Sequence, residues 1–285
     1  MAAGSGIEFG GEDETLLRHP RYCDLSYRGI LPGEPAFLAA LLRGYSIRSA
    51  PCRLLELGAG WGRIAVPLAA EFGFSVTALD REPAMLTYLS ERAGNLPLRC
   101  VQADMTRFRG EDCGGPFDAV LCPLGIANLI WVEDDFASML TSIQAALRPG
   151  GVFIASLNAA PSPDSLGQAG ATWETKAEGV RTRTEFTLLG RGELRVASHR
   201  VLVNDSSPAG GSAGIRRDLL WRARVRIVGE AFLRRMALRV AGMRLIAWHR
   251  PFDHEHALSE PNATAGFNFA VWRHEPAQRG SLPGA

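Results

Sequence analysis

The stretch that decides the fold reads Leu54-Leu55-Glu56-Leu57-Gly58-Ala59-Gly60-Trp61-Gly62-Arg63. A short apolar run leads to an acidic residue and then to three glycines spaced two apart. Glycines allow a tight turn and a close approach of a ligand to the backbone, and the start of a helix supplies unpaired N–H groups. The stretch therefore predicts a buried strand, a ligand-binding turn and the beginning of a helix.

Similar apolar runs recur after this stretch and alternate with segments of helical spacing. The expected strands are Arg53–Leu57, 75–79, Leu98–Gln102, Phe117–Cys122 and 152–157, and the expected helices are 62–72, Pro83–Ala93 and 136–147. Each run is short and apolar enough to be buried on both faces of a sheet. The alternation predicts five parallel strands joined by crossover helices.

The second half of the chain changes character. Residues 158–228 combine loop-like glycine and proline positions with β-rich pieces at 182–188, 193–203 and 215–228, which predicts an inserted antiparallel β lobe. In the last piece Arg222, Arg224 and Arg226 alternate with apolar residues, which favours a solvated strand face over an anion site. Residues 229–274 predict a helix and a pair of antiparallel strands.

Composition limits the classes of partner. The 31 basic and 30 acidic residues nearly balance, so the chain lacks the global field that would hold it on a nucleic acid or an acidic membrane. Lys176 is the only lysine, which disfavours imine chemistry and P-loop hydrolysis of nucleoside triphosphates. Five scattered cysteines without a C-x-x-C pair favour a reduced compartment, and the N-terminus does not read as a signal peptide. We expect a cytoplasmic protein that acts on a small-molecule substrate.

Asp80 helps to identify the ligand of the glycine turn. It ends the second expected strand, 22 residues after Gly58, where a carboxylate can accept hydrogen bonds from both hydroxyls of a ribose. A helix N-cap is the alternative role for this residue. The glycine spacing differs from the G-x-G-x-x-G pattern of dinucleotide-binding proteins.

With an acidic residue ahead of G-x-G-x-G, the sequence resembles the class I S-adenosylmethionine-dependent methyltransferases, in their small-molecule subtype, over residues 52–157. The resemblance implies an α/β fold with a Rossmann-like seven-stranded sheet, of five parallel strands plus an antiparallel C-terminal pair, an inserted β lobe and an N-terminal helical lid. The implied organisation is a lead and lid over 1–50, a cofactor-binding core over 51–157, the lobe over 158–228, a C-terminal helix and strands over 229–274, and a flexible tail over 275–285.

The resemblance also implies which residues bind S-adenosylmethionine. The glycine turn would line its methionine part, Asp80 its ribose and the loops after the second to fourth strands its adenosine, while aromatic residues of the lid and the turn would face the sulfonium. The implied cofactor-binding residues are Tyr22, Tyr27, Glu56, Gly58, Ala59, Gly60, Trp61, Asp80, Arg81, Met85, Asp104, Met105 and Cys122. For the two tyrosines, packing of an N-terminal helix on the core is an equally good interpretation.

Histidine is the natural general base if the acceptor needs one. His199 and His249 fall in the segments expected to form the acceptor wall, and an ordinary, partly buried histidine is the alternative for each. Asp253, His254 and His256 lack helical metal-ligand spacing and read as a charged loop, so no metal site is expected.

The leading prediction is methyl transfer from S-adenosylmethionine to a nitrogen, oxygen or carbon atom of a small metabolite, in specialised metabolism. Cys122-Pro123-Leu124-Gly125 lacks the Asn/Asp-Pro-Pro-Tyr/Phe signature of enzymes that methylate bases or amide nitrogens. Two alternatives stay open: a non-methylating member of the fold that uses the cofactor structurally or electrostatically, and an NAD-dependent oxidoreductase. A homodimer also stays open.

Overall fold

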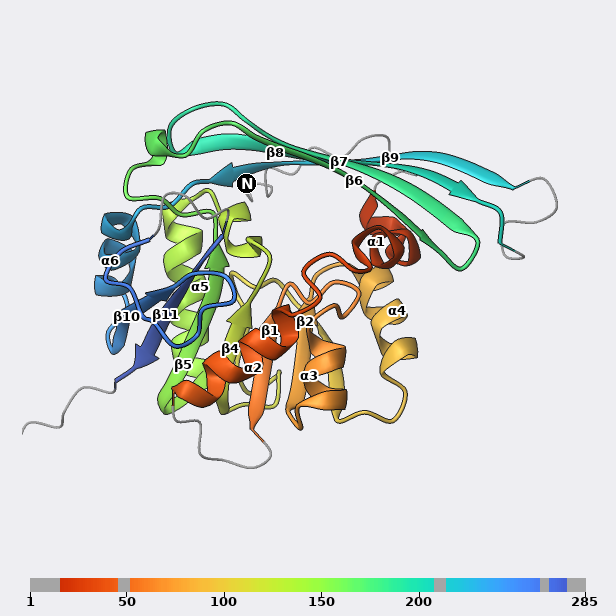
Figure 1. Ribbon diagram of the computed structural model, residues 1–285. Helices are drawn as coiled ribbons and strands as arrows, with labels where there is room; N and C mark the ends of the chain where they lie inside the picture. Colours follow the sequence, from red (N-terminus) through yellow and green to blue (C-terminus); the bar gives the residue numbers. More distant parts are fainter. Residues whose placement is uncertain (1–15, 46–51, 208–213, 262–266, 276–285) are drawn as a thin grey trace, which may run out of the picture.

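A computed structural model describes residues 16–45, 52–207, 214–261 and 267–275 of the chain. The expected flexible lead and tail lie largely outside these residues. The described part consists of a central seven-stranded sheet with helices on both faces and a separate four-stranded sheet (Figure 1).

The central sheet has the order β10-β11-β5-β4-β1-β2-β3. Strands β1 to β5 are parallel to one another, and β10 and β11 join the edge of β5 in antiparallel register. The predicted seven-stranded sheet with an antiparallel C-terminal pair is therefore confirmed. The strands are β1 Arg53–Leu57, β2 Ser75–Asp80, β3 Leu98–Gln102, β4 Phe117–Cys122, β5 Leu147–Leu157, β10 Met243–His249 and β11 Asn268–His274.

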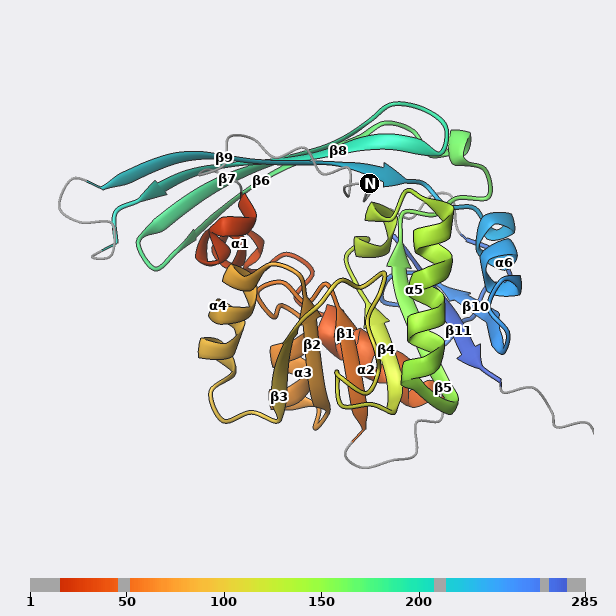
Figure 2. The ribbon, with the colours of Figure 1, turned by 180° about the vertical axis from the view of Figure 1, so that it is seen from behind.

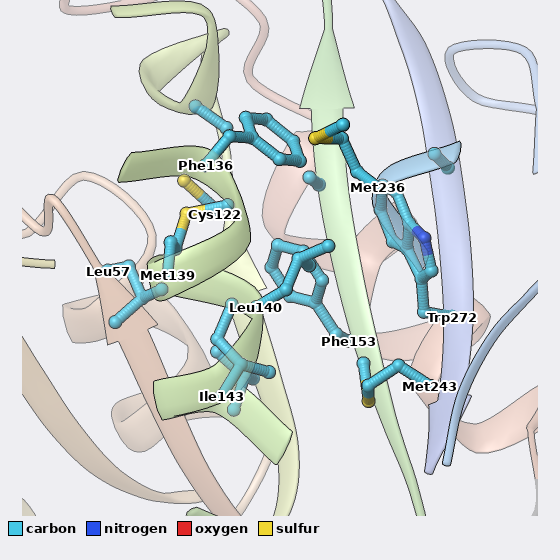
Figure 3. Close-up of a cluster of buried hydrophobic side chains, with 14 of the residues drawn as sticks. Leu57, Cys122, Phe136, Met139, Leu140, Ile143, Phe153, Met236, Met243 and Trp272 are labelled. Carbon is cyan, nitrogen blue, oxygen red and sulfur yellow. The ribbon is translucent and has the colours of Figure 1, made fainter. Parts of the chain in front are cut away.

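Two apolar layers hold helices on the faces of this sheet. Helices α2 (Glu34–Gly44), α3 (Ala65–Glu71) and α4 (Pro83–Ala93) pack on one face. Helices α5 (Glu133–Ala146) and α6 (Glu230–Leu238) cover the other, with side chains interleaved between α5 and the sheet (Figures 2 and 3). Among the described helices, none combines the length and apolar character needed to cross a bilayer.

The second sheet is inserted between β5 and α6, and we call it the lobe. Its antiparallel strands are β6 Ala169–Ala177, β7 Val180–Leu189, β8 Leu194–Asp205 and β9 Ile215–Arg226. The lobe lies across the end of the central sheet at which β5 leads into it (Figure 1). The predicted antiparallel insertion is confirmed.

The arginine face predicted for β9 is only partly solvated. Arg222 and Arg224 are exposed, but Arg226 is 8% exposed. Its guanidinium donates to the carbonyl of Trp131 at 2.7 Å and pairs with Glu193 at 2.6 Å. The last arginine of the strand therefore fastens the lobe to the loop that follows β4.

Helix α1 (Pro20–Tyr27) lies between the lobe and α4 (Figure 1). A buried carboxylate on β8 ties it to the lobe: Asp205 accepts hydrogen bonds from Arg21 at 2.9 Å and from the Tyr22 hydroxyl at 3.0 Å. Burial alone would raise the pKa of Asp205, but the hydrogen bonds from Ser207, Tyr22 and Arg21 lower it to about 2. The aspartate is thus ionised and serves as the anchor of α1.

We expect Asp205→Ala to reduce the free energy of unfolding by about 2–4 kcal/mol, because it leaves a buried hydroxyl and a guanidinium without their acceptor. Urea denaturation at pH 7 measures this loss. Because the folded-state pKa is depressed, the contribution of Asp205 is present above its unfolded value and is lost as pH falls toward 2. The difference between the two proteins should therefore shrink below about pH 4.

Asp218→Ala is the matched control. Asp218 pairs with Arg200 on the exposed face of the same lobe, where both side chains are about half exposed. An exposed pair contributes little to stability. An equal loss of stability in both variants would contradict the anchoring role of Asp205.

Candidate active site

An open cavity lies beneath the lobe, at the carboxyl ends of β1 to β4. Its volume is about 230 Å³, slightly below the range of about 300–1,000 Å³ that is usual for small-molecule sites. The lining residues are Leu17, Glu56, Gly58, Ala59, Gly60, Trp61, Arg63, Ile64, Leu79, Asp80, Arg81, Glu82, Met85, Ala103, Asp104, Met105, Thr106, Arg107, Pro123, Leu124, Ile126, Leu129, Ile130, Trp131, Val132, Asp135 and Trp221.

The glycine turn forms the floor of the cavity and depends on backbone angles that glycine adopts readily. Gly58, Gly60 and Gly62 have φ values of +66°, +53° and +85°. A Cβ atom on Gly58 would lie 2.6 Å from Cγ2 of Ile126, and one on Gly62 would lie 2.2 Å from Cδ1 of Leu89. The predicted tight turn is present, and two of its glycines are also required by close packing.

Asp80 joins the loops that follow β1 and β2. Its carboxylate accepts the N–H of Gly60 at 2.8 Å and the N–H of Glu82 at 2.9 Å. The N-cap of α4 is Glu82, so the alternative role of Asp80 as that N-cap is wrong. Asp80 instead fixes the edge of the cavity with a carboxylate that still has lone pairs for a ligand.

Glu56 and Arg63 form a charged corner beside the glycine turn. Glu56 is 2% exposed, and its pKa is raised to about 8, chiefly by burial and also by Glu34 and Asp80, while Arg63 lowers it. Arg63 donates to Glu34 at 2.7 Å. Among the described residues, Oε2 of Glu56 and Nη2 of Arg63 have no hydrogen-bond partner although both atoms are buried. Such groups are normally satisfied, so the corner is suited to a ligand with both an anionic and a cationic group.

The far end of the cavity lies over β2 and β3. Arg81 and Met85 follow β2, and Asp104 and Met105 follow β3. Asp104 accepts the N–H and the hydroxyl of Thr106 at 2.8 and 2.7 Å through one carboxylate oxygen. The structure thus brings together ten residues predicted to bind the cofactor, from Glu56 and the turn (Gly58 to Trp61) through Asp80, Arg81 and Met85 to Asp104 and Met105.

Cys122 does not line the cavity, contrary to the prediction. Side chains alternate along a strand, and this alternation turns Cys122 into the core against α5, where it is 0% exposed (Figure 3). Burial raises the pKa of its thiol to about 12, so the group is an inert core thiol. The residues that follow it, Pro123 and Leu124, line the cavity in its place.

The two tyrosines predicted to form part of a lid, Tyr22 and Tyr27, do not line the cavity. The hydroxyl of Tyr22 is bound to Asp205, and its ring packs in the cluster between α1 and the lobe. The ring of Tyr27 lies 5.3 Å from that of Trp61, centroid to centroid. Only Trp61 of this pair lines the cavity, so any effect of Tyr27 on a ligand passes through that indole.

Neither predicted histidine lines the cavity. The hydroxyl of Tyr27 and Nδ1 of His199 are 2.9 Å apart, and burial lowers the pKa of His199 to about 4. His249 is 3% exposed and lies 2.7 Å from the hydroxyl of Tyr45. His199 is therefore neutral at pH 7, and its ring packs against Trp221, which lines the cavity. His249 does not line the cavity.

The loop between β10 and β11 does not gather its acidic and histidine side chains. Nδ1 of His256 faces Asp253 at 2.9 Å, whereas the ring of His254 packs against Phe37. No group of three or more potential metal ligands occurs within the ranges that the structure describes.

Several lining residues were not predicted. Arg63 directly follows the glycine motif, so its position in the first turn after the loop is a signal that could have identified it. Trp221 comes from β9, and its place above the cavity depends on how the lobe packs. No local pattern in the sequence marks such a residue.

A glycine turn held by the acidic residue that ends β2, on a sheet of this order, agrees with the fold that the sequence resemblance implies. Residues 54–151 match the family described as a methyltransferase domain. The chain is 32% identical over 103 residues to YqeM of Bacillus subtilis (strain 168), covering 36% of this chain and 40% of that protein. The chain spans less than half the length of the curated relatives that it matches.

Two solved structures share almost the whole fold. DesVI of Streptomyces venezuelae superposes with a TM-score of 0.70 at 19% identity, over 91% of this chain and 98% of that chain. The sugar N-methyltransferase KedS8 of Streptoalloteichus sp ATCC 53650 gives a TM-score of 0.68 at 19% identity, over 96% and 99%. The chain therefore shares the fold of these two structures, and residues 54–151 match a methyltransferase domain.

We expect Gly62→Ala to destabilise the protein by about 2–4 kcal/mol, because the added methyl meets both a left-handed backbone and a buried leucine. Thermal or urea unfolding measures this loss. Gly73→Ala is the matched control: its φ is +75° but nothing lies within 4 Å of the new Cβ. It should cost only about 1 kcal/mol, and equal losses would contradict the close packing of the turn.

Proposed function

We propose that the protein transfers a methyl group from S-adenosylmethionine to a nitrogen, oxygen or carbon atom of a small molecule. The observation that carries this proposal is the corner formed by Glu56 and Arg63, which presents one buried, unpartnered acceptor and one buried, unpartnered donor to the same cavity.

The corner fits the amino-acid end of S-adenosylmethionine. Arg63 would hold its carboxylate and Glu56 its ammonium group, and each bond would satisfy an atom that has no other partner among the described residues. Asp80 would accept from the ribose hydroxyls. When bound, the cofactor supplies an electrophilic methyl group.

The charges of the floor favour this cofactor over NAD. Glu34 and Asp80 lie close enough to Glu56 to raise its pKa, and Arg63 is the cation that lowers it. Carboxylates stabilise a ligand that carries a sulfonium and an ammonium group, but they repel the diphosphate of a dinucleotide. Trp61 adds an aromatic face, which attracts a cation without removing its charge.

The lobe and α1 would keep water from the reacting atoms, as the electrophilic methyl group requires. A small acceptor is supported by the roofed cavity and by the likeness to KedS8, a sugar N-methyltransferase. Specialised metabolism is the setting that we propose. A cytoplasmic location, a homodimer and the lack of a nucleic-acid partner stay predictions.

Calorimetry with S-adenosylhomocysteine and with NADH tests the proposal. We expect binding of the first and none of the second, followed by transfer of labelled methyl groups from S-adenosylmethionine to an acceptor. Binding of NADH alone would overturn the assignment, and binding of the cofactor without transfer to any acceptor would favour the non-methylating alternative.

Asp80→Ala should weaken the binding of S-adenosylhomocysteine by about 1–3 kcal/mol, because charge-assisted hydrogen bonds to the ribose are lost. Calorimetry measures the change, and thermal unfolding shows whether the loops stay folded. Glu91→Ala removes an exposed carboxylate of α4 and is the control. An unchanged affinity in the Asp80 variant would contradict the ribose role.

The affinity for S-adenosylhomocysteine should also depend on pH through Glu56. The carboxyl is largely protonated below its pKa of about 8, whereas an ammonium ligand requires the ionised form, so binding releases a proton. The dissociation constant should fall by up to about tenfold per pH unit between pH 6 and 7.5. Glu56→Gln should bind more weakly and show a flat profile, and a pH-independent wild type would contradict the role.

A further inference from the structure

The lining of the cavity divides sharply by chemistry. Its charged side chains come from β1, β2, the loops after β1, β2 and β3, and the first turn of α5. The loop after β4 and the roof strand β9 add only apolar side chains. We call four of these residues the apolar wall: Leu124, Ile126, Leu129 and Trp221.

Leu124 occupies this wall despite an unfavourable backbone. Its φ is +56°, a left-handed conformation that suits glycine or asparagine and costs a leucine about 1–2 kcal/mol. The loop is held there from below: Gly125 donates to the buried hydroxyl of Ser156 at 3.0 Å, and Asn128 donates to the carbonyl of Arg226 at 2.6 Å. Leu124 therefore places an apolar side chain at a position where the backbone conformation favours glycine or asparagine.

Trp221 is fixed as the roof of the same wall. Its ring lies 5.3 Å from His199 in an edge-on arrangement, and His199 is held by Tyr27. Trp221 and Leu129 also pack against the apolar cluster of the lobe. The wall thus combines one aromatic ring with aliphatic side chains, and it offers a second molecule little besides apolar contact.

The wall also carries no titratable group that could act as a base. His199 lies behind the wall, uses Nδ1 toward Tyr27 and has a pKa of about 4. The acidic side chains of β1, β2 and the loops after β2 and β3 line the floor and the far end of the cavity rather than this wall. Asp135 lies beside Arg107, 3.7 Å away, with its side chain 36% exposed. A nucleophile on this wall must have an available lone pair without help, as a neutral amine does, and apolar surroundings favour that neutral form.

We propose that the acceptor is an amine carried on an apolar, ring-sized body that packs against Leu124, Leu129 and Trp221. This inference rests on the proposed methyl transfer. The nitrogen lone pair forms the new N–C bond while the C–S bond breaks, its electron pair returns to sulfur, and the ammonium product loses its proton to water. A polar, hydroxyl-rich amine would lose hydrogen bonds to water without replacement by this wall.

Acceptors matched in shape test the chemistry. We would compare 2-phenylethylamine, tryptamine and cyclohexylmethylamine with 2-phenylethanol and with glucosamine, measuring S-adenosylhomocysteine formation. We expect the three apolar amines to react at least about tenfold faster than the alcohol or the amino sugar, the size of effect expected from one well-buried apolar group. Equal or faster reaction of the alcohol or of glucosamine would overturn the proposal.

A pair of substitutions distinguishes an effect on the apolar wall from an effect on folding. Leu124→Asn suits the left-handed backbone but makes the wall polar, and Leu31→Asn makes the same change at φ +53° outside the cavity. In protein loaded with S-adenosylhomocysteine, calorimetry should show about tenfold weaker binding of 2-phenylethylamine to the Leu124 variant and no change in the Leu31 variant. Both variants should keep the wild-type affinity for S-adenosylhomocysteine.

The outcomes distinguish the two proposals. If the loaded wild type binds none of the three apolar amines, or if Leu124→Asn leaves their affinity unchanged, the acceptor assignment fails while the proposed methyl transfer stands. If S-adenosylhomocysteine itself does not bind, both fail.

Discussion

The hydrogen bond from the N–H of Gly60 to the carboxylate of Asp80, 2.8 Å long, joins the two loops on which the cavity is built. The turn that presents this N–H has left-handed backbone angles at Gly58, Gly60 and Gly62, and a Cβ on Gly58 or Gly62 would collide with a neighbouring side chain. β1 and β2 are adjacent in the sheet, so their carboxyl ends place the two loops at the same edge. This contact therefore fixes the two loops relative to each other at the floor of the cavity.

A second constraint comes from the burial of Glu56 in the same floor. An ionised carboxylate there is costly, and its high pKa expresses that cost in the free protein. Arg63 offsets the cost only in part, because its guanidinium is shared with Glu34. A bound cation would therefore stabilise the ionised form of Glu56. On the facing loop, Leu124 adopts an unfavourable left-handed backbone and places an apolar side chain in the cavity.

The central sheet was predictable because strands buried on both faces are continuous apolar runs. The bounds of β1, β3 and β4 agree with the sequence-based expectation. β6, by contrast, was not anticipated: it is an edge strand of small and polar residues, mostly exposed, and its register is set by pairing with β7. Strand formation that depends on a partner leaves little local signal.

The residues of the site likewise fall into those that the sequence could predict and those that it could not. Residues next to the glycine motif or at strand ends could be assigned from the sequence, because the topology of parallel strands brings those ends together. Cys122 was misassigned since the alternation at the end of β4 turns it into the core. Trp221 lies 160 residues beyond Trp61 in the chain yet lines the same cavity, and only the packing of the lobe on α1 and on the loop after β4 determines that. The residues of the cofactor floor can thus be recognised from local sequence patterns, whereas the apolar wall is formed by tertiary packing. For this reason one fold can present different walls to different acceptors.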